Sequence, residues 1–452
     1  TIYLARLLSP NEFGLIAMAS VTISFTRIII DAGMGDSLIQ KKQTEQVDYN
    51  SVFYYNVLIS VLFFVIIWLT AELIADFFNQ KELKEIVRVV SIIPCIYSIS
   101  VVQVVRLAKK LDFYLIARTR IITTILAGLI AIILAYNEFG VWSLVYQLLL
   151  EAILFNIVLW LVTDWRPSLI VSRKIFFEHF KYGSHLLGVQ LLNVFYRNVY
   201  AIIIGRYFST NQLGFYTRAE SIRSIMYENT FGIVKSVSYP YLSKMQQNEV
   251  DLIKNFKKIQ KYTLSVILLI CLLLMFNTTS FIEILLTKKW LEVAPILQVL
   301  LVTMVLNTFN SMNINLLKIK RRTDLYLRNE IINKVILVII LIVSINFGFD
   351  ALVLSNLVVA FLSIFVNNFF INKVISLSIT SQLRDIKGVL FAFILSTVIA
   401  YIVHSKFDEM NSIILKLSIS SIFYFIVFIF LIWVFDRVFF IDLKSFIKQL
   451  YS

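Results

Sequence analysis

Two arginines lie inside long apolar stretches of the sequence and are the first candidates for binding an anion. Arg27 and Arg197 each lie near the middle of such a stretch. A charged side chain in a membrane-spanning segment is energetically costly and usually faces a cavity or a charged partner. Because the planar guanidinium can bond two oxygens of one phosphate, the two arginines indicate a phosphate site. The alternative is that each arginine pairs with a carboxylate and only fixes helix packing.

More charges lie in the stretch 212–240. Glu220 and Arg223 are three residues apart and can pair along one helix face. Glu228 lies deeper and could bind a proton or Na⁺, or balance an arginine, and Glu151 is similarly deep in another apolar run. Either carboxylate needs a raised pKa to carry a proton, and burial provides one.

Tyrosines and glycines accompany these charges. A tyrosine can stack on a sugar face and donate a hydrogen bond, but it is also common where a helix meets the membrane surface. The tyrosines in question are Tyr196, Tyr200, Tyr216 and Tyr227. Gly33 and Gly35 follow Asp31 and predict a bend or hinge, with Asp31 capping the segment after it.

Signals of enzymatic chemistry are missing from the sequence. The three histidines, His179, His185 and His404, have no metal-ligand spacing. No glycine-rich phosphate loop occurs, so ATP hydrolysis by this chain is not expected. Cys95 and Cys271 both lie in apolar runs and are expected to be reduced core residues. We therefore predict neither a metal site nor a cofactor, apart from Na⁺ or H⁺ as a coupling ion.

The elements that must position these residues are membrane helices. Of the 452 residues, 59% are hydrophobic and 15% are charged, and the mean hydropathy is +0.82. A soluble domain has about 45–50% apolar and about 25% charged residues, so a water-soluble enzyme is excluded. The predicted spans are 13–37, 50–75, 85–106, 114–137, 141–163, 182–206, 212–240, 262–286, 292–316, 326–346, 350–372, 387–404 and 412–435.

The loops predict the orientation of these spans. Alternate loops carry most of the Lys and Arg residues, with clusters at 254–261 and 318–322, and basic loops mark the cytoplasmic side. The net charge of +14 is thus explained by topology rather than by nucleic-acid binding. Both termini are expected in the cytoplasm, which requires an even number of spans. Residues 1–8 are then the end of a truncated first helix, giving about 14 helices.

The chain also repeats itself. Arg6, Ser9, Asn11, Gly14 and Ala19 match Arg206, Ser209, Asn211, Gly214 and Ala219 at a constant offset of 200. Further matches pair 109–115 with 321–327 and 140–145 with 348–353. Six helices repeated in one orientation form a parallel repeat, a known plan of transporters.

These patterns predict an all-α integral membrane protein built from two parallel six-helix repeats and two extra C-terminal helices. The predicted parts are an N-lobe at 1–165, a cytoplasmic linker at 166–181, a C-lobe at 182–373, helices 13 and 14 at 386–436 and a cytoplasmic tail at 437–452.

Six segments, in order, resemble a known family. They read LARLLSPNEFGLIAMAS, DAGMGDSLIQ, NSVFYYNV, GVWSLV, WRPSL and IIIGRYFSTNQLGFYTRAES. The sequence is similar to the polysaccharide transporter (Wzx-type) flippases of the MOP exporter superfamily, and most similar to the colanic-acid-type branch. One departure concerns helix 7, where related flippases often carry Asn-x-Asp and this chain has Asn198 followed by Tyr200. That departure argues against a cation site on helix 7.

The resemblance implies two lobes around a central cavity and alternating access driven by a cation gradient. The implied substrate is an undecaprenyl-diphosphate-linked oligosaccharide, moved from the cytoplasmic to the outer leaflet of the bacterial inner membrane. The residues assigned to its headgroup are Arg27, Arg197, Arg223, Tyr196 and Tyr227, and those assigned to ion coupling or charge balance are Glu228, Glu220 and Glu151. Membrane lipids, and possible polysaccharide polymerase and chain-length proteins, are the expected partners.

Two other functions stay open at this point. A multidrug exporter of small amphiphilic cations would have the same lobes, but it needs an acidic cavity, and the arginines favour an anionic substrate. A membrane glycosyltransferase needs a large outer loop with catalytic groups, and the predicted outer loops are short.

Overall fold

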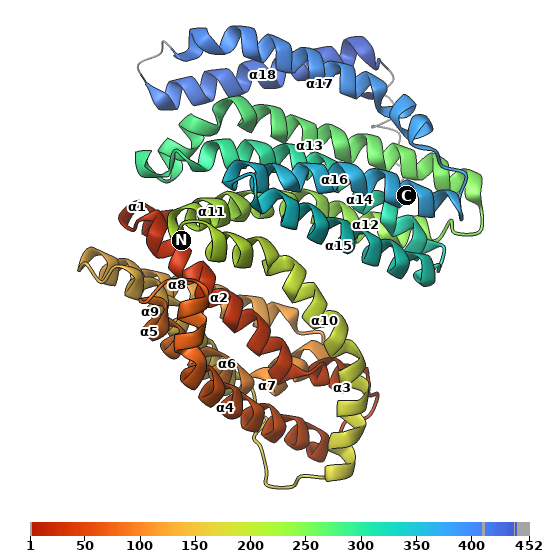
Figure 1. Cartoon of the computed structure of the whole chain (residues 1–452). Helices are drawn as coiled ribbons and strands as arrows, with labels where there is room; N and C mark the ends of the chain where they lie inside the picture. Colours follow the sequence, from red (N-terminus) through yellow and green to blue (C-terminus); the bar gives the residue numbers. More distant parts are fainter. Residues whose placement is uncertain (1, 409–411, 438, 441–452) are drawn as a thin grey trace. The chain divides into compact units, whose positions relative to one another are not determined.

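The computed structural model describes residues 2–408, 412–437 and 439–440, and it contains helices without any strand in those ranges (Figure 1). This confirms the predicted all-α class. The predicted tail at 437–452 lies mostly outside the described residues.

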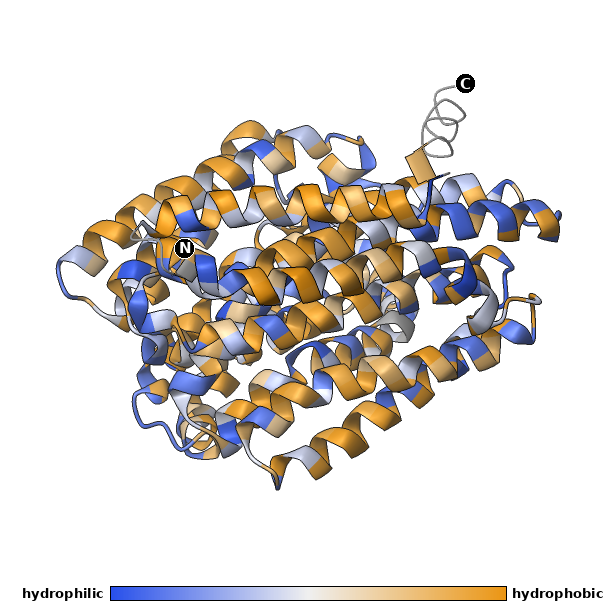
Figure 2. Ribbon diagram, turned by 90° about the horizontal axis from the view of Figure 1, so that it is seen from above, coloured by the Kyte–Doolittle hydropathy of each residue, from blue (hydrophilic) through white to orange (hydrophobic). Residues whose placement is uncertain are grey.

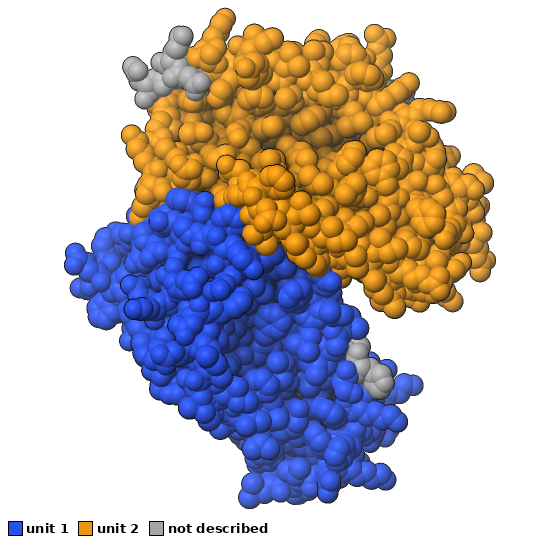
Figure 3. All heavy atoms as spheres, in the orientation of Figure 1, with its two compact units in different colours: residues 1–217 blue, residues 218–452 orange. Residues whose placement is uncertain are grey.

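The chain forms two compact units, residues 1–217 and residues 218–452 (Figure 3). Unit 1 contains α1 (Ile2–Leu7), α2 (Pro10–Asp31), α3 (Met34–Gln40), α4 (Gln46–Phe77), α5 (Leu83–Val90), α6 (Ile92–Ser98), α7 (Val101–Lys109), α8 (Phe113–Tyr136), α9 (Val141–Val162), α10 (Arg173–Tyr207) and the start of α11 (Thr210–Tyr227). Unit 2 contains the end of α11, η1 (Glu228–Gly232), α12 (Ile233–Ser243), α13 (Glu249–Leu285), η2 (Lys288–Trp290), α14 (Val293–Ile319), α15 (Thr323–Ile345), α16 (Phe349–Asn372), α17 (Ile379–Asp408) and α18 (Ile413–Phe435).

Many of these helices present apolar side chains outward. Among the described residues, ten helices are long and apolar enough to cross a membrane, and a bent pair formed by 83–98 and 101–109 makes up to eleven. On α4, Leu58, Leu69 and Leu73 are each 68–74% exposed, as expected for a face in contact with lipid. Figure 2 shows hydrophobic residues along the helices and hydrophilic ones toward their ends. The chain is therefore a multi-pass membrane protein, while the count of fourteen spans stays a prediction.

Three predicted spans are not single helices. The span 13–37 breaks between α2 and α3, where Ala32 and Gly33 both have positive φ, 45° and 70°. The span 85–106 is divided into α5, α6 and α7, and a 40° bend lies between α6 and α7. The span 212–240 contains the π-helical turn η1 between α11 and α12. A hydropathy pattern does not report such breaks, because the side chains stay apolar through them.

The repeat is visible in how α2 and α11 begin. Ser9 and Glu12 form a capping box at the start of α2, and the Ser9 N–H donates to Glu12 Oε2 over 2.6 Å. Ser209 and Gln212 do the same at the start of α11, with N–H to Oε1 at 3.0 Å and the reciprocal bond at 3.2 Å. Each box satisfies backbone donors that a helix start leaves free.

The two helix starts also touch each other. A Cβ added at Gly14 would overlap the carbonyl oxygen of Thr210, and one added at Gly214 would overlap that of Pro10. Gly14 and Gly214, like Pro10 and Thr210, are equivalent positions of the offset-200 match. Only glycine allows this close backbone approach, so the matched glycines hold the two starts together.

Helix α10 is fixed to α3 and α4 by a buried polar chain. The ring of His179 contacts Ser37 Oγ through Nδ1 (2.8 Å) and Asp48 Oδ1 through Nε2 (2.9 Å). Lys41 Nζ donates to the same carboxylate oxygen over 2.7 Å, and this bond raises the pKa of Lys41. His179 and Asp48 are each 1% exposed. Because an unpaired buried polar group is costly, these contacts fix the register of the three helices.

The segment before α10 is also bound to α4. Asn50 Nδ2 donates to Ser168 Oγ (2.7 Å) and to the carbonyl of Ile170 (3.1 Å). The predicted linker 166–181 therefore consists of a non-helical segment that packs on α4, followed by the first turns of α10. The division into lobes on either side of it stays a prediction.

In unit 2 the hairpin of α17 and α18 packs on α13. Gln260 Nε2 donates to Gln382 Oε1 (2.9 Å), and Lys257 pairs with Asp385 (2.7 Å). Lys261 pairs with Asp436, just beyond α18. These contacts join the two extra C-terminal helices to the rest of the unit.

Gly183 allows α10 to cross the break between α2 and α3. A Cβ at Gly183 would overlap the carbonyl oxygen of Ala32, whereas one at Gly188 would meet nothing within 4 Å. We expect Gly183→Ala to destabilise the protein by about 1–3 kcal/mol through overpacking. We expect Gly188→Ala to be neutral or to stabilise the protein by up to about 1 kcal/mol, because alanine has the higher helix propensity. Thermal unfolding in detergent measures both, and equal shifts would contradict the close crossing.

The polar chain makes a second prediction about stability. His179→Phe keeps the ring volume but leaves Ser37 and Asp48 without this partner, so we expect a loss of about 1–3 kcal/mol. Glu178→Gln is the control, because Glu178 is 60% exposed and lies 3.8 Å from Lys41, and such a pair contributes about 0–1 kcal/mol. Unfolding curves of both variants test this. An unchanged unfolding midpoint for His179→Phe would show that these buried polar contacts do not stabilise the protein.

Candidate functional site

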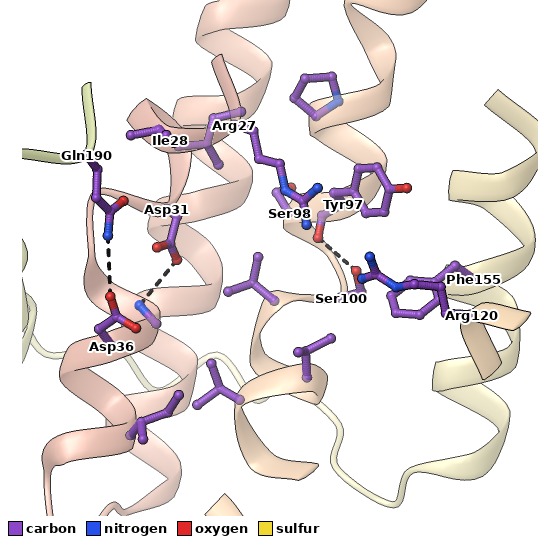
Figure 4. A pocket seen from close by; sticks show the side chains of 17 residues that line it. Arg27, Ile28, Asp31, Asp36, Tyr97, Ser98, Ser100, Arg120, Phe155 and Gln190 are labelled. Carbon is purple, nitrogen blue, oxygen red and sulfur yellow. Dashed lines mark hydrogen bonds between the residues drawn. The ribbon is translucent and has the colours of Figure 1, made fainter. Parts of the chain in front are cut away.

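A cavity of about 300 Å³ lies within unit 1 and is lined by α2, α3, α6, α7, α8, α9 and α10 (Figure 4). The cavity lies at the break between α2 and α3, because residues on both sides of that break line it. Its lining residues are Arg27, Ile28, Ile30, Asp31, Gly35, Asp36, Ile39, Pro94, Tyr97, Ser98, Ser100, Val101, Val104, Val105, Arg120, Phe155 and Gln190.

Two arginines of the cavity are held by aromatic rings. The guanidinium carbon of Arg27 lies 4.8 Å from the ring centre of Tyr97, and that of Arg120 lies 5.2 Å from the ring centre of Phe155. A ring face attracts a cation without accepting its hydrogen bonds. Both arginines are exposed, and neither forms an ion pair within the described part of the chain. Their N–H groups can therefore bind an anion.

The carboxylate of Glu151 also acts on Tyr97. Glu151 Oε1 accepts a hydrogen bond from Thr124 Oγ1 over 2.8 Å. Glu151, Arg27 and Arg120 all act electrostatically on Tyr97. The region thus contains two positive charges and one negative charge around one tyrosine.

The α3–α10 side of the cavity is acidic. Asp31 Oδ1 accepts the N–H of Gly35 over 3.2 Å, and Asp31 interacts electrostatically with Arg27 and Asp36. Asp36 Oδ2 accepts a bond from Gln190 Nε2 over 3.3 Å. No cation pairs with Asp36 among the described residues.

The structure brings together only some of the predicted site residues. Arg27 and Gly35 line the cavity, and Glu151 lies close to its tyrosine. Gly33 lies at the helix break, where its motion as a hinge stays a prediction. Arg197 and Tyr196 are on α10 but do not line the cavity. Arg197 is exposed, and its binding of a phosphate stays a prediction.

The remaining predicted residues belong to unit 2. Arg223 Nε donates to Glu220 Oε2 over 2.8 Å, which is the pair that their spacing predicts. Tyr227 donates to Ser311 Oγ over 3.0 Å and faces the guanidinium of Arg223 at 5.7 Å. Glu228 is exposed at the first position of η1. Their proposed roles in substrate binding and ion coupling stay predictions.

The sequence analysis missed most of the lining residues of the cavity, among them Tyr97, Arg120, Asp36 and Gln190. Arg120 lies within the predicted span 114–137, so the same cost argument that selected Arg27 would have found it. Asp36 and Gln190 are 154 positions apart, and no pattern in the sequence joins them. Among the described residues no group of three His, Cys, Asp or Glu side chains could hold a metal ion.

Solved structures share this fold. The chain superposes on a lipid II flippase in an inward closed conformation with a TM-score of 0.75 and 15% identity, over 98% of this chain and 96% of that one. It superposes on an inward-facing multidrug resistance MATE family transporter of the MOP superfamily with a TM-score of 0.55 and 17% identity, over 82% and 93%. The class of protein is thus an α-helical membrane protein with the fold that these two structures share.

Sequence comparison gives the family. A model of the family described as polysaccharide biosynthesis protein matches residues 3–295, and the chain belongs to that family. This confirms the resemblance found in the sequence.

Curated relatives are similar over part of their length. Teichuronic acid biosynthesis protein TuaB of Bacillus subtilis is 27% identical over 67% of this chain and 63% of its own. Succinoglycan biosynthesis transport protein ExoT of Rhizobium meliloti is 27% identical over 54% and 50%. Lipopolysaccharide biosynthesis protein WzxC of Escherichia coli is 24% identical over 71% and 66%. The chain thus spans about half to two thirds of the length of these relatives.

Proposed function

We propose that this protein moves an undecaprenyl-diphosphate-linked oligosaccharide from the cytoplasmic to the outer leaflet of the bacterial inner membrane, for surface or exopolysaccharide biosynthesis. The observation that carries this proposal is the cavity with Arg27 and Arg120, two cations inside a membrane-spanning helix bundle that form no ion pair with any residue the structure describes. The names of the relatives support it, since they concern teichuronic acid, succinoglycan and lipopolysaccharide biosynthesis.

The chemistry of the substrate explains why such a cavity is needed. A diphosphate carries negative charge that a hydrocarbon medium strongly disfavours. Two guanidinium groups can replace water around its oxygens by paired, charge-assisted hydrogen bonds. Tyr97 and Phe155 hold the guanidiniums in place through their ring faces. No covalent bond changes in this process, so the protein acts as a transporter, by alternating access of the cavity to the two sides.

A cation gradient is proposed to drive the transport. Glu151 is the leading candidate for the coupling group, because its charge acts on the tyrosine between the two arginines. Proton or Na⁺ binding at Glu151 would change the potential felt by a bound diphosphate. Glu220, which pairs with Arg223, and Glu228 are the other candidates.

The orientation and the partners belong to the same proposal. We place both termini in the cytoplasm, from the distribution of Lys and Arg among the loops. Membrane lipids surround the protein, and polysaccharide polymerase and chain-length proteins are the proposed protein partners.

The arginines provide the first test. We expect Arg27→Ala and Arg120→Ala each to slow the flipping of a fluorescent undecaprenyl-diphosphate oligosaccharide in proteoliposomes about tenfold or more, since a charge-assisted hydrogen bond contributes about 1.5–3 kcal/mol. Arg118→Ala is the matched control, because Arg118 is exposed on the same helix and does not line the cavity.

A second arm of that assay offers a cationic dye. Dye transport without lipid flipping would contradict the proposal and favour an exporter of amphiphilic cations. Flipping that is slowed equally by Arg118→Ala would show that the effect of the arginines does not depend on the cavity.

Ion coupling has its own test. We expect Glu151→Gln to abolish the acceleration of flipping by an imposed Na⁺ or proton gradient, because the neutral amide no longer binds the ion. Glu138→Gln, in the exposed loop after α8, is expected to behave like the wild type. Flipping by Glu151→Gln that still responds fully to both gradients would exclude Glu151 as the coupling group.

A further inference from the structure

The cavity in unit 1 is polarised in charge. Figure 4 shows Asp31, Asp36 and Gln190 on one side and Tyr97 and Arg120 on the other. Arg27 lies on α2 and interacts with both sides, through the ring of Tyr97 and the charge of Asp31. An anion alone would need only the cationic part, so the acidic part calls for a separate explanation.

Asp36 is the group that such an explanation must address. Its side chain is exposed and lines the cavity, and it accepts a weak hydrogen bond from Gln190 Nε2 at 3.3 Å. Asp31, in contrast, is engaged by the N–H of Gly35 and by Arg27. A carboxylate and an amide side by side offer both acceptors and a donor, and this combination suits the hydroxyl groups of a sugar.

The size of the cavity limits what can occupy it. At about 300 Å³ it lies at the small end of ligand sites. It would hold the diphosphate and the sugar attached to it, and not a whole oligosaccharide. With the diphosphate at Arg27 and Arg120, that first sugar lies toward Asp36.

We propose that this cavity selects substrates whose first sugar, the one bonded to the diphosphate, is uncharged. The proposal rests on the proposed function and specifies its substrate class. Asp36 and Gln190 bind the hydroxyls of a neutral sugar there. A uronic acid in the same place would bring its carboxylate toward that of Asp36, and like charges at short range repel each other.

The test compares two synthetic lipids that differ at one carbon, farnesyl diphosphate carrying glucose and the same lipid carrying glucuronic acid. Binding to the whole protein in nanodiscs is measured for each. We expect the wild type to bind the glucose lipid about tenfold more tightly, a difference of about 1.4 kcal/mol. Asp36→Asn should reduce this ratio to about threefold or less, mainly by tighter binding of the glucuronic acid lipid.

Three further variants show whether the effect belongs to Asp36. Asp36→Glu keeps the charge and should keep the preference. Gln190→Leu should weaken binding of the glucose lipid by about threefold or more, through loss of its hydrogen bonds. Glu82→Gln replaces an exposed carboxylate at the start of α5 that does not line the cavity, and it should change neither affinity.

The outcomes separate this inference from the proposed function. Equal wild-type affinities, or a preference that Asp36→Asn leaves unchanged, would overturn the inference while the proposed function stands. Failure of both lipids to bind to the wild type would overturn both. Weaker binding of both lipids to Arg27→Ala, with the preference intact, is the result that supports both together.

Discussion

The energetic cost of charge in hydrocarbon determines how this protein is built. Backbone groups satisfy each other within helices, but a guanidinium has no partner in lipid and must be given one. Here the partners of Arg27 and Arg120 are the ring faces of Tyr97 and Phe155. A ring stabilises the cation and leaves its hydrogen-bond donors free. A carboxylate in the same place would also have stabilised the arginine, but it would have used those donors and closed the site to an anion.

The position of the cavity depends on irregular backbone at the end of α2. Ala32 and Gly33 both have positive φ, and the chain resumes as the short helix α3, which carries Asp36 to the cavity. This break is supported from outside by α10, through Gly183 against Ala32 and His179 against Ser37. The same helix supplies Gln190 to the cavity. One long helix therefore stabilises the break and completes the site that the break creates.

The sequence predicts the helices better than it predicts the site. Apolar runs identify every predicted span as helical, because lipid contact requires apolar side chains whatever the packing. Breaks leave hydropathy unchanged: the one at Ala32 is indicated only by the glycines Gly33 and Gly35, and the π-helical turn η1 is not indicated at all. Arg27 is selected because a lone charge in an apolar run is costly, and the same argument applies to Arg120, which lies within the predicted span 114–137. Asp36, Gln190 and His179 gain their roles only from tertiary packing.

The paired glycines at the starts of α2 and α11 have a further consequence. Gly14 packs against the carbonyl of Thr210, and Gly214 packs against the carbonyl of Pro10. Each copy of the repeat therefore makes the same contact with the other copy. This reciprocity is the signature of an isologous interface, the kind formed by two identical subunits around a twofold axis. In this protein the reciprocal contact joins two copies of a repeat within one chain rather than two subunits. Substitutions at the two helix starts are consequently coupled. A larger residue at Gly14 or Gly214 would require the backbone of the opposite helix start to move away.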